Sequence, residues 1–107
     1  PFKIYIDMAN RCFLYASDAS NDSIAVDSDR VNAIRNTDTT TVVVDFSDAG
    51  GAAKAITLGV TSGKAEHVCR EIGRLVLSGR GVIVLADDQN GIYGVDGIEE
   101  VDTITHS

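Results

Sequence analysis

Short blocks of hydrophobic residues alternate with polar, turn-forming residues along most of this chain. The blocks are rich in Val, Ile, Tyr and Thr, and the residues between them are mainly Gly, Asn, Asp and Ser. This pattern is typical of β-strands joined by turns. We therefore expect strands at residues 3–8, 12–16, 24–26, 31–34, 40–46, 55–60, 82–85, 92–95 and 98–104.

The strongest strand signal lies at residues 40–46. Its first five residues are all β-branched, which favours an extended backbone over a helix. The run of apolar positions predicts a central strand with both faces covered. The turn-rich segment 47–51 then predicts antiparallel pairing with the strand at 55–60. Residues 9–11 and the Asn90-Gly91 pair likewise predict hairpins between the strands on either side of them.

Helical spacing replaces the strand pattern at residues 64–78. Apolar residues recur there every three or four positions, which predicts one amphipathic α-helix. Thr61 or Ser62 is expected to cap its start, and Gly79 to end it in a left-handed turn. The buried stripe should contain Val68, Ile72 and Val76.

Many strands and one helix indicate an α+β fold. The helix must bury its apolar stripe against the strands, so we expect a mostly antiparallel, curled sheet or partly open barrel packed against a single helix. The 107 residues fit a single domain spanning residues 1–107.

The segment from Gly59 to Lys64 lies between a predicted strand and the predicted helix and resembles a phosphate-binding loop. Such a loop needs four residues between its glycines and a Ser or Thr after the lysine. Here three residues separate Gly59 from Gly63, and Ala65 follows Lys64. The spacing therefore favours a strand end and a helix start over a nucleotide site.

Other combinations of reactive residues are also incomplete. Cys12 and Cys69 lack metal-ligand spacing and are expected to be core thiols. The stretch 87–91 contains oxygen ligands, but its spacing does not match a calcium loop and fits a hairpin turn. His67 and His106 belong to no catalytic spacing. The sequence therefore predicts no enzyme, no cofactor and no metal site.

The net charge of −7 narrows the choice of partners. An acidic chain repels phosphate backbones and anionic membrane surfaces, so we expect neither nucleic acid nor a membrane as a partner. No apolar run is long enough to span a bilayer, and residues 1–5 lack the apolar block of a secretion signal. We expect a protein that no signal peptide directs to secretion.

Charge is unevenly distributed along the chain. No Lys or Arg follows Arg80, and the C-terminal quarter is acidic. Arg70, Arg74 and Arg80 fall within one short span, which is suited to head-to-tail protein contacts. A solvated helix face balanced by nearby glutamates is the commoner explanation of such a span.

The order of these elements resembles that of small virion-associated proteins of marine tailed phages, particularly those that infect cyanobacteria. The resemblance rests on the acidic, Asp- and Thr-rich composition, on the Thr-Thr-Thr-Val-Val-Val run at residues 39–44, and on the helix that begins Ser62-Gly63-Lys64. A terminal strand pair completes it. It implies a structural role in the virion, as a capsid decoration protein or a tail or neck component, and no active site.

We therefore expect a non-enzymatic virion protein that binds a major capsid or tail protein and copies of itself. Edge strands at 3–8 or 98–104 are candidates for pairing with neighbours. A small intracellular binding or regulatory module is the alternative from another class. The residues expected to contribute to an interface are Phe2, Ile4, Tyr5, Phe13, Tyr15, Arg70, Arg74 and Arg80.

Overall fold

Strands dominate the structure, a computed structural model that describes residues 12–48 and 50–105. One α-helix and one short 3-10 turn interrupt them. In chain order the elements are β1 (Cys12–Ser17), β2 (Ser23–Asp27), η1 (Ser28–Arg30), β3 (Val31–Asp38), β4 (Thr41–Ser47), β5 (Ala53–Val60), α2 (Ala65–Ser78), β6 (Gly81–Asp87), β7 (Ile92–Tyr93) and β8 (Ile98–Thr105).

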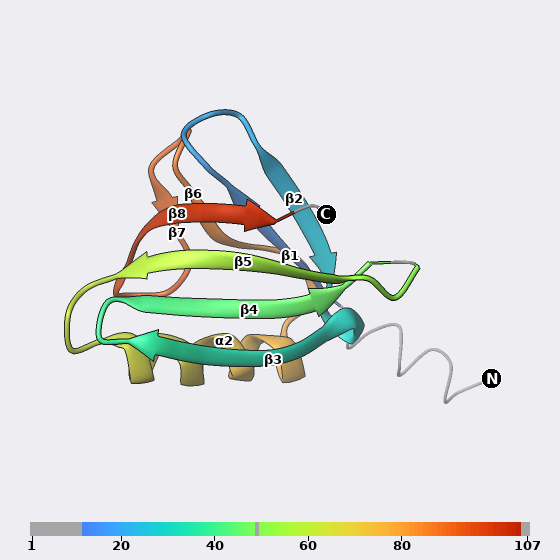
Figure 1. Cartoon of the computed structure of the whole chain (residues 1–107), viewed down its shortest axis with the longest axis horizontal. Helices are drawn as coiled ribbons and strands as arrows, with labels where there is room; N and C mark the ends of the chain where they lie inside the picture. Colours follow the sequence, from blue (N-terminus) through green and yellow to red (C-terminus); the bar gives the residue numbers. More distant parts are fainter. Residues whose placement is uncertain (1–11, 49, 106–107) are drawn as a thin grey trace.

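The described strands form two four-stranded sheets. Sheet A has the order β2-β1-β6-β7, and sheet B has the order β3-β4-β5-β8 (Figure 1). The expectation of a mostly antiparallel β-protein with one α-helix is confirmed. The sequence predicted one curled sheet or partly open barrel, whereas these strands divide into two sheets and do not close into a barrel.

Sheet A contains a pairing that the turn pattern does not predict. β1 pairs with β2 in antiparallel fashion on one edge and with β6 in parallel fashion on the other. Cys12 and Gly81 are partners in this parallel pairing, although most of the described chain separates them in sequence. The hairpin expected between residues 3–8 and 12–16 falls partly outside the described residues.

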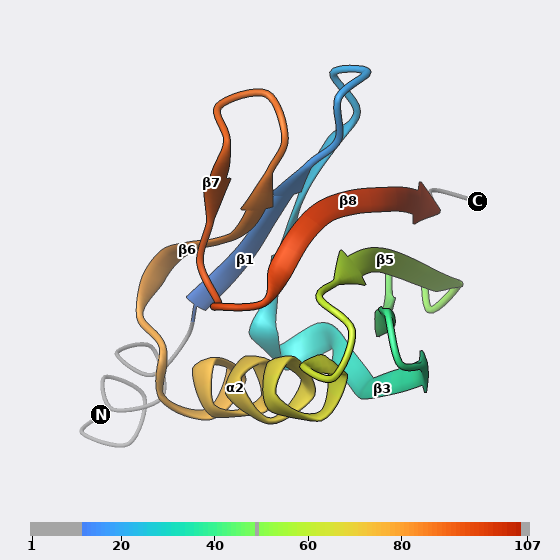
Figure 2. The same cartoon turned by 90° about the vertical axis from the view of Figure 1, so that its left-hand side faces the viewer.

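The core lies where sheet A, sheet B and α2 meet, and Figure 2 shows the three around a shared centre. α2 packs against β3, β4 and η1. Val68 and Ile72 are fully buried, as the helical spacing predicts, whereas Val76 is only half-buried. Leu14, Ile56 and Leu85 supply the largest buried side chains from the strands.

β4 is a central strand, as its run of β-branched residues predicts. It pairs with β3 and β5, and Val42, Val43 and Val44 are all buried. Val42 and Val44 belong to the core shared with sheet A and α2, whereas Val43 faces the other side of sheet B. Burial on both faces explains why this stretch does not alternate with polar residues.

α2 begins one residue after the predicted start and ends at the predicted Ser78, but both predicted caps are wrong. The residue that precedes the helix is Lys64, and no side chain caps it. Thr61 instead closes a turn, because its carbonyl accepts the Lys64 N–H at 2.9 Å. Gly79 has φ −72° and ψ 155°, so it is extended and not left-handed. It is required for space, because a Cβ there would collide with the Leu75 carbonyl and the Ile83 side chain.

Candidate interaction surface

The face of sheet A that points away from the core carries a strip of apolar side chains, here called the outer strip. Residues paired across strands share one face of a sheet. Phe13 pairs with Val82 on β6, and Tyr15 pairs with Ala25 on β2 and with Val84 on β6. The outer strip therefore consists of Phe13, Tyr15, Ala25, Val82 and Val84.

The alternation of β1 explains this arrangement. Cys12, Leu14 and Ala16 point into the core, and the residues between them must then face outward. Phe13 is 41% exposed and its neighbour Val82 is 69% exposed. Two large apolar side chains thus lie next to each other on a rigid sheet and in contact with solvent. Contiguous exposed apolar surface of this kind is typical of protein interaction sites.

The structure brings together only part of the predicted interface. Phe13 and Tyr15 are on the outer strip, as an interface requires. Arg70 and Arg74 lie on the exposed side of α2, which packs on sheet B, and Arg74 Nη2 lies 3.3 Å from Glu71 Oε1. Arg80 is exposed directly before β6. The other predicted residues, Phe2, Ile4 and Tyr5, lie outside the described residues.

Sequence reasoning missed Val82, Val84 and Ala25. The run Val82-Ile83-Val84-Leu85 is apolar throughout, so its outward positions cannot be separated from its inward ones by pattern alone. The register with β1 makes the separation, because it aligns Val82 with the outward Phe13. Only the strand pairing shows which valines of this apolar run face outward.

The segment from Gly59 to Lys64, which resembles a phosphate-binding loop in sequence, connects the start of α2 to β8 and to the loop before it. Thr61 N donates to the Gly97 carbonyl at 2.8 Å, and Thr61 Oγ1 donates to Glu99 Oε2 at 2.7 Å. Lys64 Nζ lies 2.7 Å from Asp96 Oδ2 and lowers the pKa of that carboxyl through a hydrogen bond and its charge. These donors are directed at the protein's own oxygens.

The acidic stretch at the end of β6 also accepts hydrogen bonds from the protein's own N–H groups. Asp87 Oδ1 accepts the Gln89 and Asn90 backbone N–H groups, at 3.0 and 3.2 Å, which closes the turn between β6 and β7. The hairpin expected around Asn90 and Gly91 is confirmed. Within residues 12–48 and 50–105, no three His, Cys, Asp or Glu side chains are grouped so as to hold a metal ion.

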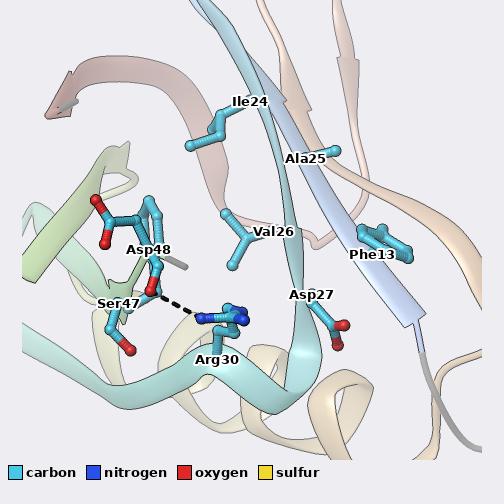
Figure 3. Close-up of a pocket in the computed structure, with 9 residues that line it drawn as sticks. Phe13, Ile24, Ala25, Val26, Asp27, Arg30, Ser47 and Asp48 are labelled. Atoms are coloured by element: carbon cyan, nitrogen blue, oxygen red, sulfur yellow. Dashed lines mark hydrogen bonds between the residues drawn. The ribbon is translucent and has the colours of Figure 1, made fainter. Parts of the chain in front are cut away.

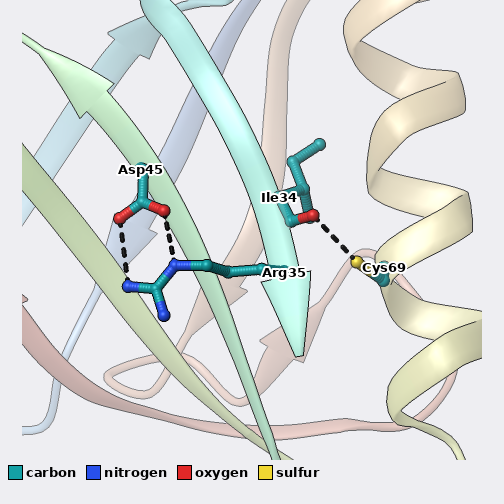
Figure 4. Close-up of polar contacts among 4 residues, drawn as sticks. All are labelled: Ile34, Arg35, Asp45 and Cys69. Carbon is teal, nitrogen blue, oxygen red and sulfur yellow. Dashed lines mark hydrogen bonds and ion pairs between the residues drawn. The ribbon is translucent and has the colours of Figure 1, made fainter. Parts of the chain in front are cut away.

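The two thiols differ in their surroundings. Cys12 is 1% exposed, and its Sγ donates to the Leu75 carbonyl at 3.6 Å. Cys69 on α2 is half-buried and donates to the Ile34 carbonyl of β3 at 3.2 Å (Figure 4). Burial raises the pKa of the Cys69 thiol, because a thiolate loses hydration there. Such a thiol is a weak nucleophile.

A groove of about 330 Å³ runs beside the outer edge of β2. Phe46, Ser47 and Asp48 line its far side, and Arg30 spans its end by donating from Nη1 to the Asp48 carbonyl at 2.8 Å (Figure 3). Phe13 of the outer strip also reaches it. The groove therefore adjoins the outer strip, although Asp27, Arg30 and Asp48 give it charged walls.

Comparisons of the chain with protein-family models, with curated proteins and with solved structures found no match. In the described part of the chain, no helix has the length and apolar character needed to cross a membrane.

Proposed function

We propose that this protein is a non-enzymatic assembly protein of a virion, a capsid decoration protein that binds other virion subunits through the outer strip. The observation that carries the proposal is the exposure of Phe13 and Val82 side by side on sheet A. Burial of about 25 cal/mol per Å² of apolar surface on contact gives such a strip its affinity for protein. The virion setting rests on the resemblance to small phage structural proteins.

The charge of the chain supports a protein partner. With a net charge of −7, the molecule is repelled by nucleic-acid phosphates, and Asp27, which pairs with Phe13, adds a negative charge beside the outer strip. The contacts of the outer strip itself would be mainly apolar and would vary little with salt. A basic or neutral apolar patch on a capsid subunit is a suitable counterpart.

Mass spectrometry of purified particles tests the virion role. The chain should be present in many copies per particle, and in the head fraction once heads and tails are separated. Its presence in the tail or neck fraction would replace decoration with a tail or neck role. Absence from the particles would overturn the virion proposal altogether.

The binding surface is tested separately, by co-sedimentation with particles stripped of this chain. Val82→Ser should weaken binding, because it removes the most exposed large apolar side chain of the outer strip. The matched control is Leu77→Ser: Leu77 is 82% exposed but lies on α2. Equal binding by the two variants would contradict the assignment of the outer strip.

A further inference from the structure

The four outer strands of the two sheets differ in how their free edges are protected. Free edges bind other strands unless they are short, irregular or covered. β7 is two residues long, and β3 packs against α2 and shifts register twice along β4. On β8, the Val101 N–H donates to the Asp88 carboxylate, with 3.0 Å between Val101 N and Asp88 Oδ2. Three edges are therefore poor templates.

β2 lacks these protective features in the part of the chain that the structure describes. It pairs with β1 over five consecutive positions without a register shift. Its sequence, Ser-Ile-Ala-Val-Asp, contains no proline, glycine or lysine. The groove described above leaves room beside it, and Figure 3 shows Ile24 and Val26 pointing toward Asp48 while Ala25 points the opposite way.

Two hydrogen bonds show which amides of β2 face its open edge. Asp18 N donates to the Asp22 carbonyl at 2.8 Å, and Cys12 N donates to Ser28 Oγ at 3.3 Å. Asp18 and Asp22 form the next pair of the β1–β2 register beyond Ser17 and Ser23, and Cys12 and Ser28 form the next pair beyond Phe13 and Asp27. Bonded and non-bonded pairs alternate along such a register. By this alternation Ile24 and Val26 direct their backbone groups toward β1. Ala25, between them, directs its N–H and C=O to the open edge.

We propose that β2 pairs antiparallel with β2 of a second copy of this chain, with Ala25 opposite the partner's Ala25. In this register Ile24 lies opposite the partner's Val26, so each pair on the face toward sheet B is apolar. Val26 is only 4% exposed, so the half-buried Ile24 supplies most of the apolar surface that the pairing covers. Ser23 lies opposite the partner's Asp27, so no like charges face each other directly. The strand is thus complementary to itself.

This register also has a consequence for the outer strip. A two-fold axis through an antiparallel pair is perpendicular to the sheet, so the outer faces of both copies lie on the same side. Ala25 belongs to the outer strip and sits on the axis, so the strips of two copies join into one surface. The biological meaning of this pairing rests on the proposed assembly role. The two are tested separately, because the pairing is measured on the isolated protein and the assembly role on particles.

A charge-swap at position 25 tests the pairing by sedimentation equilibrium. Ala25→Lys and Ala25→Asp each place like charges opposite one another, so each dimer should dissociate severalfold more readily than wild type. An equimolar mixture of the two variants should recover the dimer, because opposite charges then meet. A wild-type chain that stays monomeric at about 1 mM would overturn the proposal, as would variants that dimerise as tightly as wild type.

Two further variants separate the contact from the fold. Ala25→Pro removes an N–H that faces the open edge and none that bonds β1, so dimerisation should weaken about tenfold while the monomer stays folded by circular dichroism. Leu77→Lys adds the same charge as Ala25→Lys on α2 and should leave the dimer unchanged. Wild-type dimerisation by a folded Ala25→Pro variant would refute the pairing.

Discussion

The carboxylate of Asp88 accepts the backbone N–H of Val101 through both oxygens, at 3.2 and 3.0 Å. Asp88 follows β6 of sheet A, and Val101 lies in β8 of sheet B, so this contact joins the two sheets. Tyr93 Oη donates to the same carboxylate at 2.9 Å. One acidic side chain thus protects the edge of β8 and fixes its distance from the β6–β7 hairpin.

Asp88→Ala should lower the free energy of unfolding by about 1–3 kcal/mol, because the Val101 N–H is left without its acceptor in a largely buried position. Urea unfolding measures the change. Asp88→Asn keeps an acceptor oxygen and should cost less. A loss below about 0.5 kcal/mol for Asp88→Ala would show that water replaces the carboxylate without cost.

Stability should also fall at alkaline pH because of Tyr93. The hydrogen bond to Asp88, together with partial burial and the charges of neighbouring carboxylates, raises the pKa of Tyr93. A raised acid pKa means that the folded state favours the protonated phenol. The stabilisation is therefore complete below the ordinary pKa of about 10 and is lost as pH rises through the folded-state pKa.

Phenolate absorbance during an alkaline titration follows this group directly. Asp88→Ala should move the Tyr93 titration to lower pH, toward the ordinary value, because it removes both the hydrogen bond and the negative charge. Tyr93→Phe identifies its share of the absorbance change, because Tyr5 and Tyr15 remain. An unchanged titration in Asp88→Ala would exclude the hydrogen bond as the main cause.

Two glycines at the α2 end of the core should respond to alanine in opposite directions. At Gly79 a Cβ would collide with the Ile83 side chain and the Leu75 carbonyl, so Gly79→Ala should destabilise by about 1–3 kcal/mol. At Gly73, inside α2, a Cβ meets open space, so Gly73→Ala should stabilise by about 0.5–1 kcal/mol. Thermal melts of both variants measure these changes in stability. A change of the same sign in both variants would contradict the packing described at Gly79.

Thiol labelling of the native protein should discriminate between the two cysteines. Cys69 is half-buried with a raised pKa, so it should react with a disulfide reagent near pH 8 more slowly than a free thiol. Cys12 should react more slowly still, at a rate limited by opening of the fold. Labelling of Cys69→Ser and Cys12→Ser separates the rates, and faster labelling of Cys12 would contradict its burial.

Of the residues that the sequence proposed for an interface, the structure places Phe13 and Tyr15 on the outer face of β1. In β1 the small and aliphatic residues point inward, which leaves Phe13 and Tyr15 outside. In β6 four apolar residues follow one another, so the pattern does not show which of them face outward, and it does not identify Val82 as exposed. The basic residues of α2 share only a stretch of sequence with Arg80, and the fold places them on another element than the outer strip.

Local chemistry determined the elements of this protein, and long-range pairing determined their arrangement. Helical spacing specifies α2, and β-branched runs specify β4, because backbone preference and amphipathicity act over a few residues. The parallel pairing of Cys12 with Gly81 has no local signature, because strands distant in sequence pair only when the whole core closes. Within residues 12–48 and 50–105, tertiary structure alone therefore decided that the strands form two sheets, that the outer strip is exposed, and that β2 has an open edge.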